Sequence, residues 1–239
     1  MEEIYMARKR RFCTRLEILK LASEMFLSQG YTTSSTKKMA QKLGISVGNL
    51  AYHFPTKEYL LVDLTEHLCD YHFQVMESKI DDGRASLTAY MLELTSMIAI
   101  CEDNEVAKDL YTSVYKSPMA LNLIRKADTQ KATQVFATFC PEWTQDDFVL
   151  AENIVSGIEY ASLMRENAEH IPLETRICRT LDAVLRVYRV PREIRQEKIQ
   201  KVLSIDYRRI GQQFIEGFTE YVERVKQQAL DRAYDQIDR

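Results

Sequence analysis

The chain has 239 residues, of which 46% are hydrophobic and 28% are charged, and this balance excludes a disordered or fibrous protein. It holds only 7 glycines and 5 prolines and few alternating apolar and polar stretches, which excludes a β-sandwich or barrel and predicts an all-α fold. The net charge of −3 is unevenly distributed, because residues 1–57 hold ten Lys or Arg against four Asp or Glu. A basic segment on an acidic body indicates either a nucleic-acid-binding module or a solvated basic face.

The sequence also bounds the compartment. No apolar run approaches the length of a membrane span, and no apolar segment typical of a signal peptide follows the N-terminus. The five cysteines are scattered without a C-x-x-C pair, which suits a reducing environment. We therefore expect a cytoplasmic protein without a membrane partner.

At the start of the chain, residues 1–11 are expected to form a mobile arm. Its basic run, residues 8–11, either reaches a neighbouring DNA minor groove or is a disordered basic tail. A first helix is predicted over about 14–29, because Ile18, Ala22, Met25 and Phe26 follow one helical stripe and Gly30 ends it.

Residues 36–55, TKKMAQKLGISVGNLAYHFP, predict a helix-turn-helix. Ala40 has the small side chain that a close approach of two helices requires. Gly44 falls where the first helix must stop, in a left-handed conformation that costs little only for glycine. Ser46 is a good N-cap for a second helix over about 47–54, whose inner face carries Leu50. An ordinary helix corner is the alternative for this pair alone.

The flanking residues narrow the choice. The segment ILKLASEMFLSQGY (18–31), the helix-turn-helix and NLAYHFPTK (49–57) together resemble the N-terminal domain of the TetR family of transcriptional regulators. This resemblance covers about residues 15–61. It implies an N-terminal DNA-binding domain, here 1–57, followed by a larger helical domain for ligand binding and dimerisation, here 58–239.

The DNA-binding residues follow from the helix-turn-helix and the resemblance. Two helix N-termini and exposed side chains of the second helix are expected to meet double-stranded operator DNA, with Val47 pressing on a thymine methyl and Asn49 bonding a base edge or a phosphate. The resemblance implies that Lys57 contacts the DNA backbone. The full set is Ser35, Lys37, Ser46, Val47, Gly48, Asn49, Tyr52, His53 and Lys57. His53 is explained equally well as a packed, hydrogen-bonded side chain.

A fourth helix is predicted from Lys57 to about residue 80. Asp63 and His67 lie four residues apart on one of its faces, which is compatible with a metal, but an amphipathic helix explains them better. No metal or other cofactor is expected. After a turn at 81–84, further helices are predicted over about 86–103, 105–116, 118–139, 145–167, 173–189, 192–204 and 206–233.

The helices over 145–167 and 173–189 look like the pair that TetR-like proteins use to form a four-helix dimer interface. We expect a homodimer that buries the apolar stripes of both, although part of each stripe must be intrachain core. The predicted interface residues are Ala151, Ile154, Ile158, Ala161, Ile177, Leu181, Val184 and Tyr188.

A small-molecule effector is expected in the larger domain, partly from the resemblance and partly because Met and aromatic residues make adaptable pockets. In the family, ligand binding shifts the fourth helix and changes the separation of the two DNA-reading helices. The candidate ligand-binding residues are Met97, Tyr111, Tyr115, Trp143, Asn153, Glu159 and Tyr160. The effector's identity is not readable from the sequence.

We therefore expect a two-domain transcriptional regulator, most simply a repressor released from a pseudo-palindromic operator by its ligand. No G-x-S-x-G, P-loop or dinucleotide motif is present, so no catalytic residue and no enzyme activity are expected. Two alternatives stay open: a helical small-molecule enzyme, and an interaction module with a degenerate helix-turn-helix. Val47 and Ala51, apolar where the family pattern is polar or Tyr, favour the second alternative.

Overall fold

The computed structural model describes residues 2–79, 86–164 and 170–235, without the side chains of 2–13, 73, 74 and 76–79. These residues form eleven helices and no strand, which confirms the predicted all-α fold. The helices are α1 (Glu2–Gln29), α2 (Thr36–Lys42), α3 (Val47–His53), α4 (Lys57–Lys79), α5 (Leu87–Asp103), α6 (Glu105–Lys116), α7 (Pro118–Phe136), α8 (Gln145–Leu163), α9 (Leu173–Val187), α10 (Arg192–Leu203) and α11 (Tyr207–Asp235). Within these ranges, none of the helices is both long and apolar enough to cross a bilayer.

Short polar side chains fix where several helices begin. Ser86, Asn104, Ser117 and Thr144 each accept a hydrogen bond from a backbone N–H three residues further on, at the starts of α5, α6, α7 and α8. These bonds satisfy N–H groups that the first helical turn leaves without a partner. The predicted starts therefore agree closely with the structure, whereas α7 and α8 end three and four residues earlier than predicted.

The first helix is longer than predicted. Its backbone is helical from Glu2, so the expected mobile arm over 1–11 is corrected to a helical extension of α1. Residues 2–13 contain no glycine or proline, and Glu, Met, Ala, Lys and Arg dominate them, all of which favour helix. The basic side chains of residues 8–11 lie outside the described residues.

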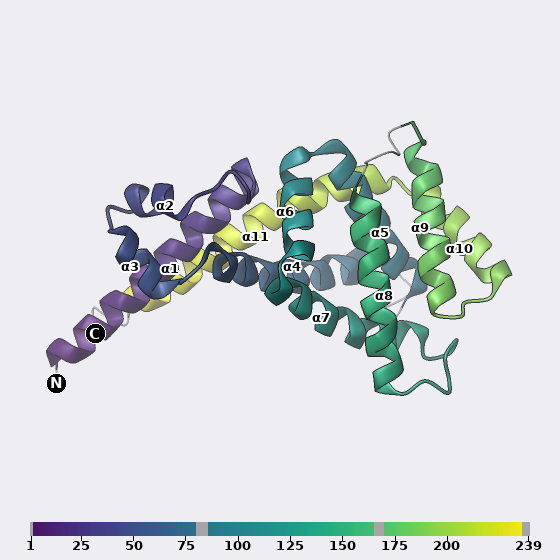
Figure 1. Cartoon of the computed structure of the whole chain (residues 1–239), viewed down its shortest axis with the longest axis horizontal. Coiled ribbons are helices and arrows are strands. Elements are labelled where there is room, and N and C mark those ends of the chain that lie inside the picture. The colour runs from purple at the N-terminus through teal and green to yellow at the C-terminus, as the bar shows by residue number, and fades with distance from the viewer. Residues whose placement is uncertain (1, 80–85, 165–169, 236–239) are drawn as a thin grey trace.

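Figure 1 shows how the helices are arranged. Helices α1–α3 form one end of the molecule, and α4 leads from there into a body that contains α5–α10. The last helix, α11, runs back from the body to the first end and lies along α1, the most extensive contact between any two helices. The two ends are therefore joined by both α4 and α11. One continuous apolar core extends from Ile18 through Leu50 to Phe218.

Helix α5 is the centre of the body. Nearly all of its residues are buried, and it contacts α4 and every helix from α6 to α11. The run from Leu94 to Cys101 contains no charged residue, which makes burial on all sides favourable.

Helix α11 packs mainly through aromatic side chains. Phe214, Phe218 and Tyr221 surround the ring of Tyr71 on α4, with ring centroids 5.0–5.6 Å apart. Near its C-terminal end, Leu230 and Ala233 form a small apolar cluster with Leu16 of α1. The prediction that the last helix packs against the protein is correct.

Candidate functional site

Helices α2 and α3 form the predicted helix-turn-helix. The Ser35 hydroxyl accepts from the Lys38 N–H at 3.2 Å, and the Ser46 hydroxyl accepts from the Asn49 N–H at 3.0 Å, so each serine caps its helix. Gly44 has φ +65°, the left-handed conformation expected at the end of the first helix. The turn therefore places the N-terminus of α3 at the surface of the molecule.

The two faces of α3 differ sharply. Leu50 and the following Phe54 are buried, and they anchor the helix on Ala40 and the rest of the core. Outside this buried stripe, Val47 is 50% exposed and Tyr52 is 61% exposed. An apolar side chain and an aromatic ring are thus held in solvent by a helix that is rigidly attached from behind, which is the arrangement that a groove-reading helix needs.

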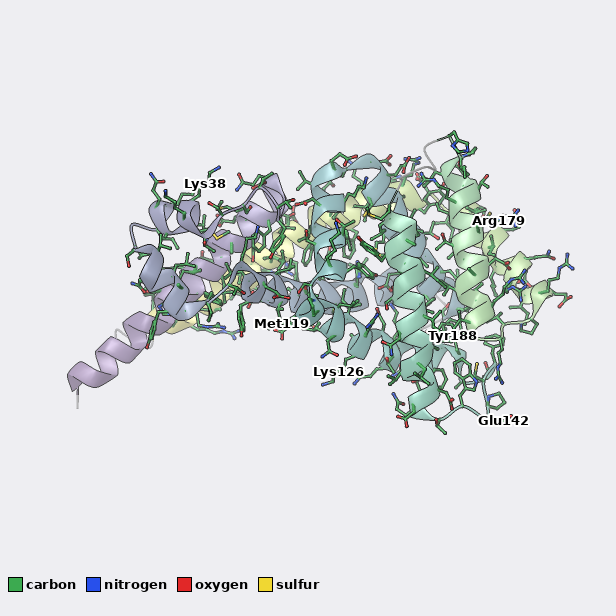
Figure 2. All side chains as sticks on the ribbon, viewed as in Figure 1. Lys38, Met119, Lys126, Glu142, Arg179 and Tyr188 are labelled. Carbon is green, nitrogen blue, oxygen red and sulfur yellow. The ribbon has the colours of Figure 1, made fainter. Side chains whose placement is uncertain are left out.

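Basic side chains surround this face. Lys37, Lys38 and Lys42 on α2 are exposed, and Figure 2 shows Lys38 at the outer edge of the α1–α3 end. Gly48 and Asn49 in the first turn of α3 are also exposed, whereas His53 is half-buried with its ring against Tyr52. The predicted DNA-binding residues other than Lys57 therefore divide into two groups: most lie at the N-termini of α2 and α3, whereas Tyr52 and His53 lie in the last turn of α3.

Lys57 has a structural role that the sequence did not predict. Its ammonium donates to the carbonyl oxygens of Tyr31 at 2.7 Å and Ser34 at 3.0 Å, and lies 4.0 Å from the centre of the Tyr31 ring. Burial lowers the pKa of Lys57, and the nearby Asp109 opposes this effect. The side chain therefore ties the start of α4 to the corner between α1 and α2, in addition to any contact with DNA.

Helix α6 contacts the same corner from the body. Asp109 accepts from the Thr32 backbone N–H at 2.9 Å and from the Thr32 hydroxyl. Gly30 has φ +92°, and a side chain there would bring its Cβ within 2.7 Å of the Asp109 carboxylate. Beside this contact, Ser117 donates to Glu58 in the first turn of α4. The DNA-binding end is therefore fixed to α6 as well as to α4.

The body contains a cavity of about 370 Å³ between α4, α5, α6, α7 and α8. It is lined by Leu68, Cys69, Asp70, His72, Tyr90, Glu93, Leu94, Met97, Tyr111, Tyr115, Ile124, Ala127, Asp128, Gln130, Lys131, Gln134 and Glu159. Its volume lies within the range of small-molecule sites, which are mostly apolar with a few placed polar groups.

Four of the seven predicted ligand-binding residues line this cavity: Met97, Tyr111, Tyr115 and Glu159. The other three are corrected. Trp143 packs on Phe148 at the start of α8, Asn153 is exposed, and Tyr160 stacks on the ring of Tyr115 without lining the cavity. For Trp143, the sequence alone does not distinguish an aromatic residue in a loop contact from one in a cavity.

A hydrogen-bonded network occupies one wall of the cavity. The Glu93 carboxylate pairs with Lys131 and lies 3.2 Å from His72 Nδ1, while the other ring nitrogen of His72 is 3.4 Å from the Tyr111 hydroxyl. On the opposite wall, Tyr115 donates to Glu159 at 2.9 Å.

Burial perturbs the ionisation of these groups. It lowers the pKa of His72 to about 3, helped by Lys131, and it lowers the pKa of Lys131 to about 8 against the attraction of Glu159. It raises the pKa of Glu159 to about 7, and burial together with Glu159 raises the pKa of Asp128. Perturbed groups that converge in a cavity indicate a functional site.

The sequence did not predict Tyr90, Asp128, Lys131 or His72 as cavity residues. Asp128 and Lys131 lie one turn apart on α7, a spacing that also describes an ordinary solvated face. One feature of the sequence points to buried polar groups on α5, namely the uncharged run that begins one residue after Glu93. Such a run predicts that α5 is central and that its polar residues are buried.

The predicted dimer interface is corrected in part. Ile177, Leu181 and Val184 of α9 and Tyr188, which directly follows it, are at most 1% exposed and belong to the core of their own chain. The Tyr188 ring stacks on Phe136 at 3.8 Å. The α9 stripe therefore faces inward, because α9 packs on α5 and α8 and is covered by α10.

Helix α8 presents a different apolar face. Leu150 is 62% exposed and Ile154 is 58% exposed, and Gly157 and Ala161 continue the same face. Of the four predicted α8 residues, Ala151 is buried, Ile158 is half-buried, and Ile154 and Ala161 are exposed. A stripe with large exposed side chains on a helix that is packed from behind indicates an interaction surface.

The structure explains Asp63 and His67 without a metal. Asp63 forms an ion pair with Lys226 of α11, and His67 lies beside the Tyr221 ring. Among the residues that the structure describes, no group of three or more His, Cys, Asp or Glu side chains is arranged to hold a metal ion.

Comparisons with known proteins agree with this geometry. Residues 18–64 match the bacterial regulatory proteins of the tetR family. The chain is 26% identical over 155 residues to the HTH-type transcriptional regulator QacR of Staphylococcus aureus, covering 59% of this chain and 82% of that protein. It is 28% identical over 96 residues to the HTH-type transcriptional regulator LmrA of Bacillus subtilis, covering 38% of this chain and 51% of that protein.

Two solved structures are similar at lower identity. One is a gamma-butyrolactone receptor described as an ArpA-like protein, at 16% identity with a TM-score of 0.44, covering 85% of this chain and 98% of the other. The second is AmtR of Mycobacterium smegmatis, at 19% identity with a TM-score of 0.34, covering 79% and 93%. The capped helix-turn-helix and the exposed side chains of α3 therefore lie within the segment, residues 18–64, that matches the bacterial regulatory proteins of the tetR family.

Proposed function

We propose that this protein is a cytoplasmic, homodimeric transcriptional repressor that binds operator DNA through α3 and is released by a small molecule in the body cavity. The observation that carries the proposal is the contrast on α3, where Leu50 is buried and Val47 and Tyr52 are exposed beside two capped helix N-termini. Residues 1–57 would form the DNA-binding domain and residues 58–239 the ligand-binding and dimerisation domain.

In the proposed complex, the capped N-termini of α2 and α3 approach phosphates, which backbone N–H groups and helix dipoles favour. Val47 would contact a thymine methyl and Asn49 a base edge, while the Tyr52 hydroxyl and Lys37 would contact the backbone. One short helix covers too few base pairs to be selective in a genome, so specific binding requires two copies.

The exposed stripe of α8, with Leu150 and Ile154 at its centre, is the proposed dimer surface. Two-fold pairing through this stripe would present two α3 helices to a pseudo-palindromic operator, with half-sites about 34–36 Å apart or a multiple of that distance. Contacts from α9 would come from its polar outer face, because its apolar stripe is used within the chain.

Control by a ligand is supported by the position of the cavity. Tyr111 and Tyr115 line it from α6, and Asp109, half a turn before Tyr111, holds the α1–α2 corner. Helix α4 lines the same cavity with Leu68 and begins at Lys57, which holds that corner from the other side. A ligand that moves α4 or α6 would thus move the DNA-binding end. A tenfold loss of operator affinity requires a coupling of about 1.4 kcal/mol.

The most direct test is an electrophoretic shift with the DNA upstream of the protein's own gene, followed by footprinting of any shifted fragment. We expect a salt-sensitive, saturable complex over a pseudo-palindrome. Binding equal to that of random DNA at physiological salt would contradict the proposal and favour an interaction module with a degenerate helix-turn-helix. Mass spectrometry of any bound ligand before and after incubation would detect turnover and so test the enzyme alternative.

A further inference from the structure

The cavity holds more acid than base. Four carboxylates line it, from Asp70, Glu93, Asp128 and Glu159, against one ammonium, from Lys131. His72 adds no positive charge near neutral pH, because burial lowers its pKa to about 3. In small-molecule sites, a few placed polar or charged groups of this kind provide specificity.

The single ammonium that lines the cavity already has a carboxylate partner. Lys131 forms an ion pair with Glu93, and the ring nitrogen Nδ1 of His72 lies 3.2 Å from the same Glu93 carboxylate. Glu159, which is 7% exposed, receives only the neutral Tyr115 hydroxyl among the described residues. Asp128 receives no hydrogen bond from the described part of the chain, and its carboxylate faces the same cavity. Asp70 is exposed to solvent, and the other two carboxylates, Asp128 and Glu159, form no ion pair with a described residue, although Lys131 attracts Glu159.

A hydroxyl group that lines the cavity also has no hydrogen-bond partner within the described residues. Tyr90 is 6% exposed and lines the cavity, and its buried hydroxyl has no hydrogen-bond partner within the described residues. This hydroxyl lies within electrostatic reach of Glu152, Glu159 and Asp128, which together with burial raise the pKa of Tyr90. A buried polar group without a partner costs stability, so its presence beside two uncompensated acids needs an explanation.

Resting on the function proposed above, we propose that the effector is a small organic amine, bound as its protonated cation by Asp128 and Glu159. Its N–H groups satisfy both carboxylates, and its nitrogen lies beside the Tyr90 hydroxyl, which accepts from it. The cation must carry N–H donors, because a quaternary ammonium would leave the carboxylates and the hydroxyl without hydrogen bonds.

The rest of the cavity fits the body of such a molecule. Leu68, Leu94, Met97 and Ile124 provide apolar contact, and the Tyr111 ring provides an aromatic surface. The volume of about 370 Å³ lies near the lower end for small-molecule sites, which favours a single ring or a short alkyl chain.

Ionisation gives the site a measurable signature. Without ligand, Glu159 is partly protonated at neutral pH, because its pKa is raised to about 7, and the pKa of Asp128 is raised by burial and by Glu159. A bound cation favours the ionised carboxylates, so binding releases protons and weakens as the pH falls below 7. The other titratable or charged groups around these two acids are Cys69, Asp70 and His72 on α4, Tyr90 and Glu93 on α5, Tyr111 and Tyr115 on α6, Arg125 and Lys131 on α7, and Glu152 on α8.

Isothermal titration calorimetry on the full-length protein tests the proposal with phenethylamine, benzylamine and hexylamine. Matched probes with the same body are phenethyl alcohol, hydrocinnamate and trimethylphenethylammonium. We expect at least one primary amine to bind at millimolar concentration or below, with proton release, and at least tenfold more tightly than each matched probe. Asp128→Asn, Glu159→Gln and Tyr90→Phe should each weaken that amine, the first two by tenfold or more.

Glu66→Gln is the matched control, because Glu66 is exposed on α4 and does not line the cavity, and it should change affinity by less than threefold. Circular dichroism confirms that each variant is folded. Binding of the alcohol or the carboxylate as tightly as the amine, or no binding by any amine, overturns the cation assignment. Equal binding of trimethylphenethylammonium overturns the role of the N–H donors.

The same proteins separate this inference from the proposed function. If amines bind as expected but leave operator affinity unchanged, the amine site stands and the ligand-controlled repressor fails. If the protein binds its operator but no amine, the DNA-binding function stands and the amine site fails.

Discussion

Lys226 of α11 donates to the carboxylate of Asp63 on α4, and this pair lies between the body and the DNA-binding end. The Lys226 side chain is 4% exposed, and that of Asp63 is 21% exposed. Burial lowers the pKa of Lys226, and Asp63 opposes this effect, so the ammonium is held charged by one carboxylate. Together with the contact of Leu230 on Leu16, the pair makes α11 a second connection between the two ends, parallel to α4.

We expect Lys226→Met to lower the free energy of unfolding by about 2 kcal/mol, because it leaves Asp63 partly buried without its charged donor. Asp63→Asn in the same background should recover part of the loss, since the remaining group is then neutral. Urea denaturation of the two single variants and the double variant measures the coupling. Gln228→Ala, on the exposed face of α11, is the control; a Lys226 variant as stable as this control would mean that the pair contributes nothing.

The sequence predicted the helices well because their boundaries are local. Ser46, Asn104 and Thr144 cap the helices that follow them, and glycine or proline marks several ends, so neighbours in the chain fix the limits. It failed at residues 2–13, where a basic composition suggested a mobile arm but good helix formers extend α1.

The sites depended on tertiary contacts and were predicted less well. On α9, Ile177 and Val184 form a stripe that suits a dimer interface and an intrachain core equally, and only the position of α5 and α10 decides between them. The resemblance implied that Lys57 contacts a DNA phosphate. In the structure, its ammonium also donates to carbonyl oxygens of a corner more than twenty residues earlier in the chain. The uncompensated charge of Asp128 could not be recognised from the sequence, because it depends on Lys131 pairing with a different helix.

For DNA binding, Lys37→Ala should weaken the complex at every sequence alike and reduce the slope of log affinity against log salt by about one unit. Asn49→Ala should instead change which bases are preferred within the half-site, at a cost of about 1–3 kcal/mol. Arg179→Ala is the control, because Arg179 is exposed on α9 at the other end of the molecule (Figure 2). Titrations at several salt concentrations on a selected operator measure both effects. An unchanged slope and unchanged base preference would show that α3 does not read DNA.

Lys57→Ala should combine two effects, because the ammonium holds the carbonyls of Tyr31 and Ser34. We expect a loss of about 1–2 kcal/mol in stability, since two partly buried acceptors lose a charged donor, together with weaker DNA binding. Lys57→Met keeps the apolar stem over the Tyr31 ring and should lose less stability than the alanine variant. Thermal unfolding and DNA titration of both variants separate the roles: a stable variant that fails to bind would assign Lys57 to the phosphate alone.

The dimer surface can be tested on α8. Leu150→Lys with Ile154→Lys should give a folded monomer that has lost operator affinity, because both side chains are more than half exposed within one chain. Val184→Lys, the corresponding change on α9, should unfold the protein, since that side chain is fully buried. Met119→Lys, at an exposed apolar residue of α7, is the control. Sedimentation velocity reports the mass; a dimer that survives the double change would exclude the α8 stripe.

The last prediction concerns the pH dependence of stability in the absence of ligand. Burial raises the pKa of Glu159 from 4.5 to about 7, so the folded state binds a proton there that the unfolded state has lost. The stability associated with this proton is fully present below pH 4.5 and is lost as the pH rises through about 7, and the total loss is about 3 kcal/mol.

Glu159→Gln removes this titration and keeps an acceptor for the Tyr115 hydroxyl. The free energy of unfolding of the variant should therefore increase relative to that of the wild type as the pH rises. We expect the difference in unfolding free energy between the two proteins to increase from pH 5 to pH 8 and then to stay constant. Glu142→Gln, at an exposed residue before α8, should follow the wild type at every pH. Urea denaturation across this range measures the curves. If the Glu159→Gln and wild-type curves are parallel, Glu159 titrates normally and the cavity is open to water in solution. If they diverge as expected, the empty site costs stability at neutral pH, and a bound cation would recover it by allowing the carboxylate to ionise in place.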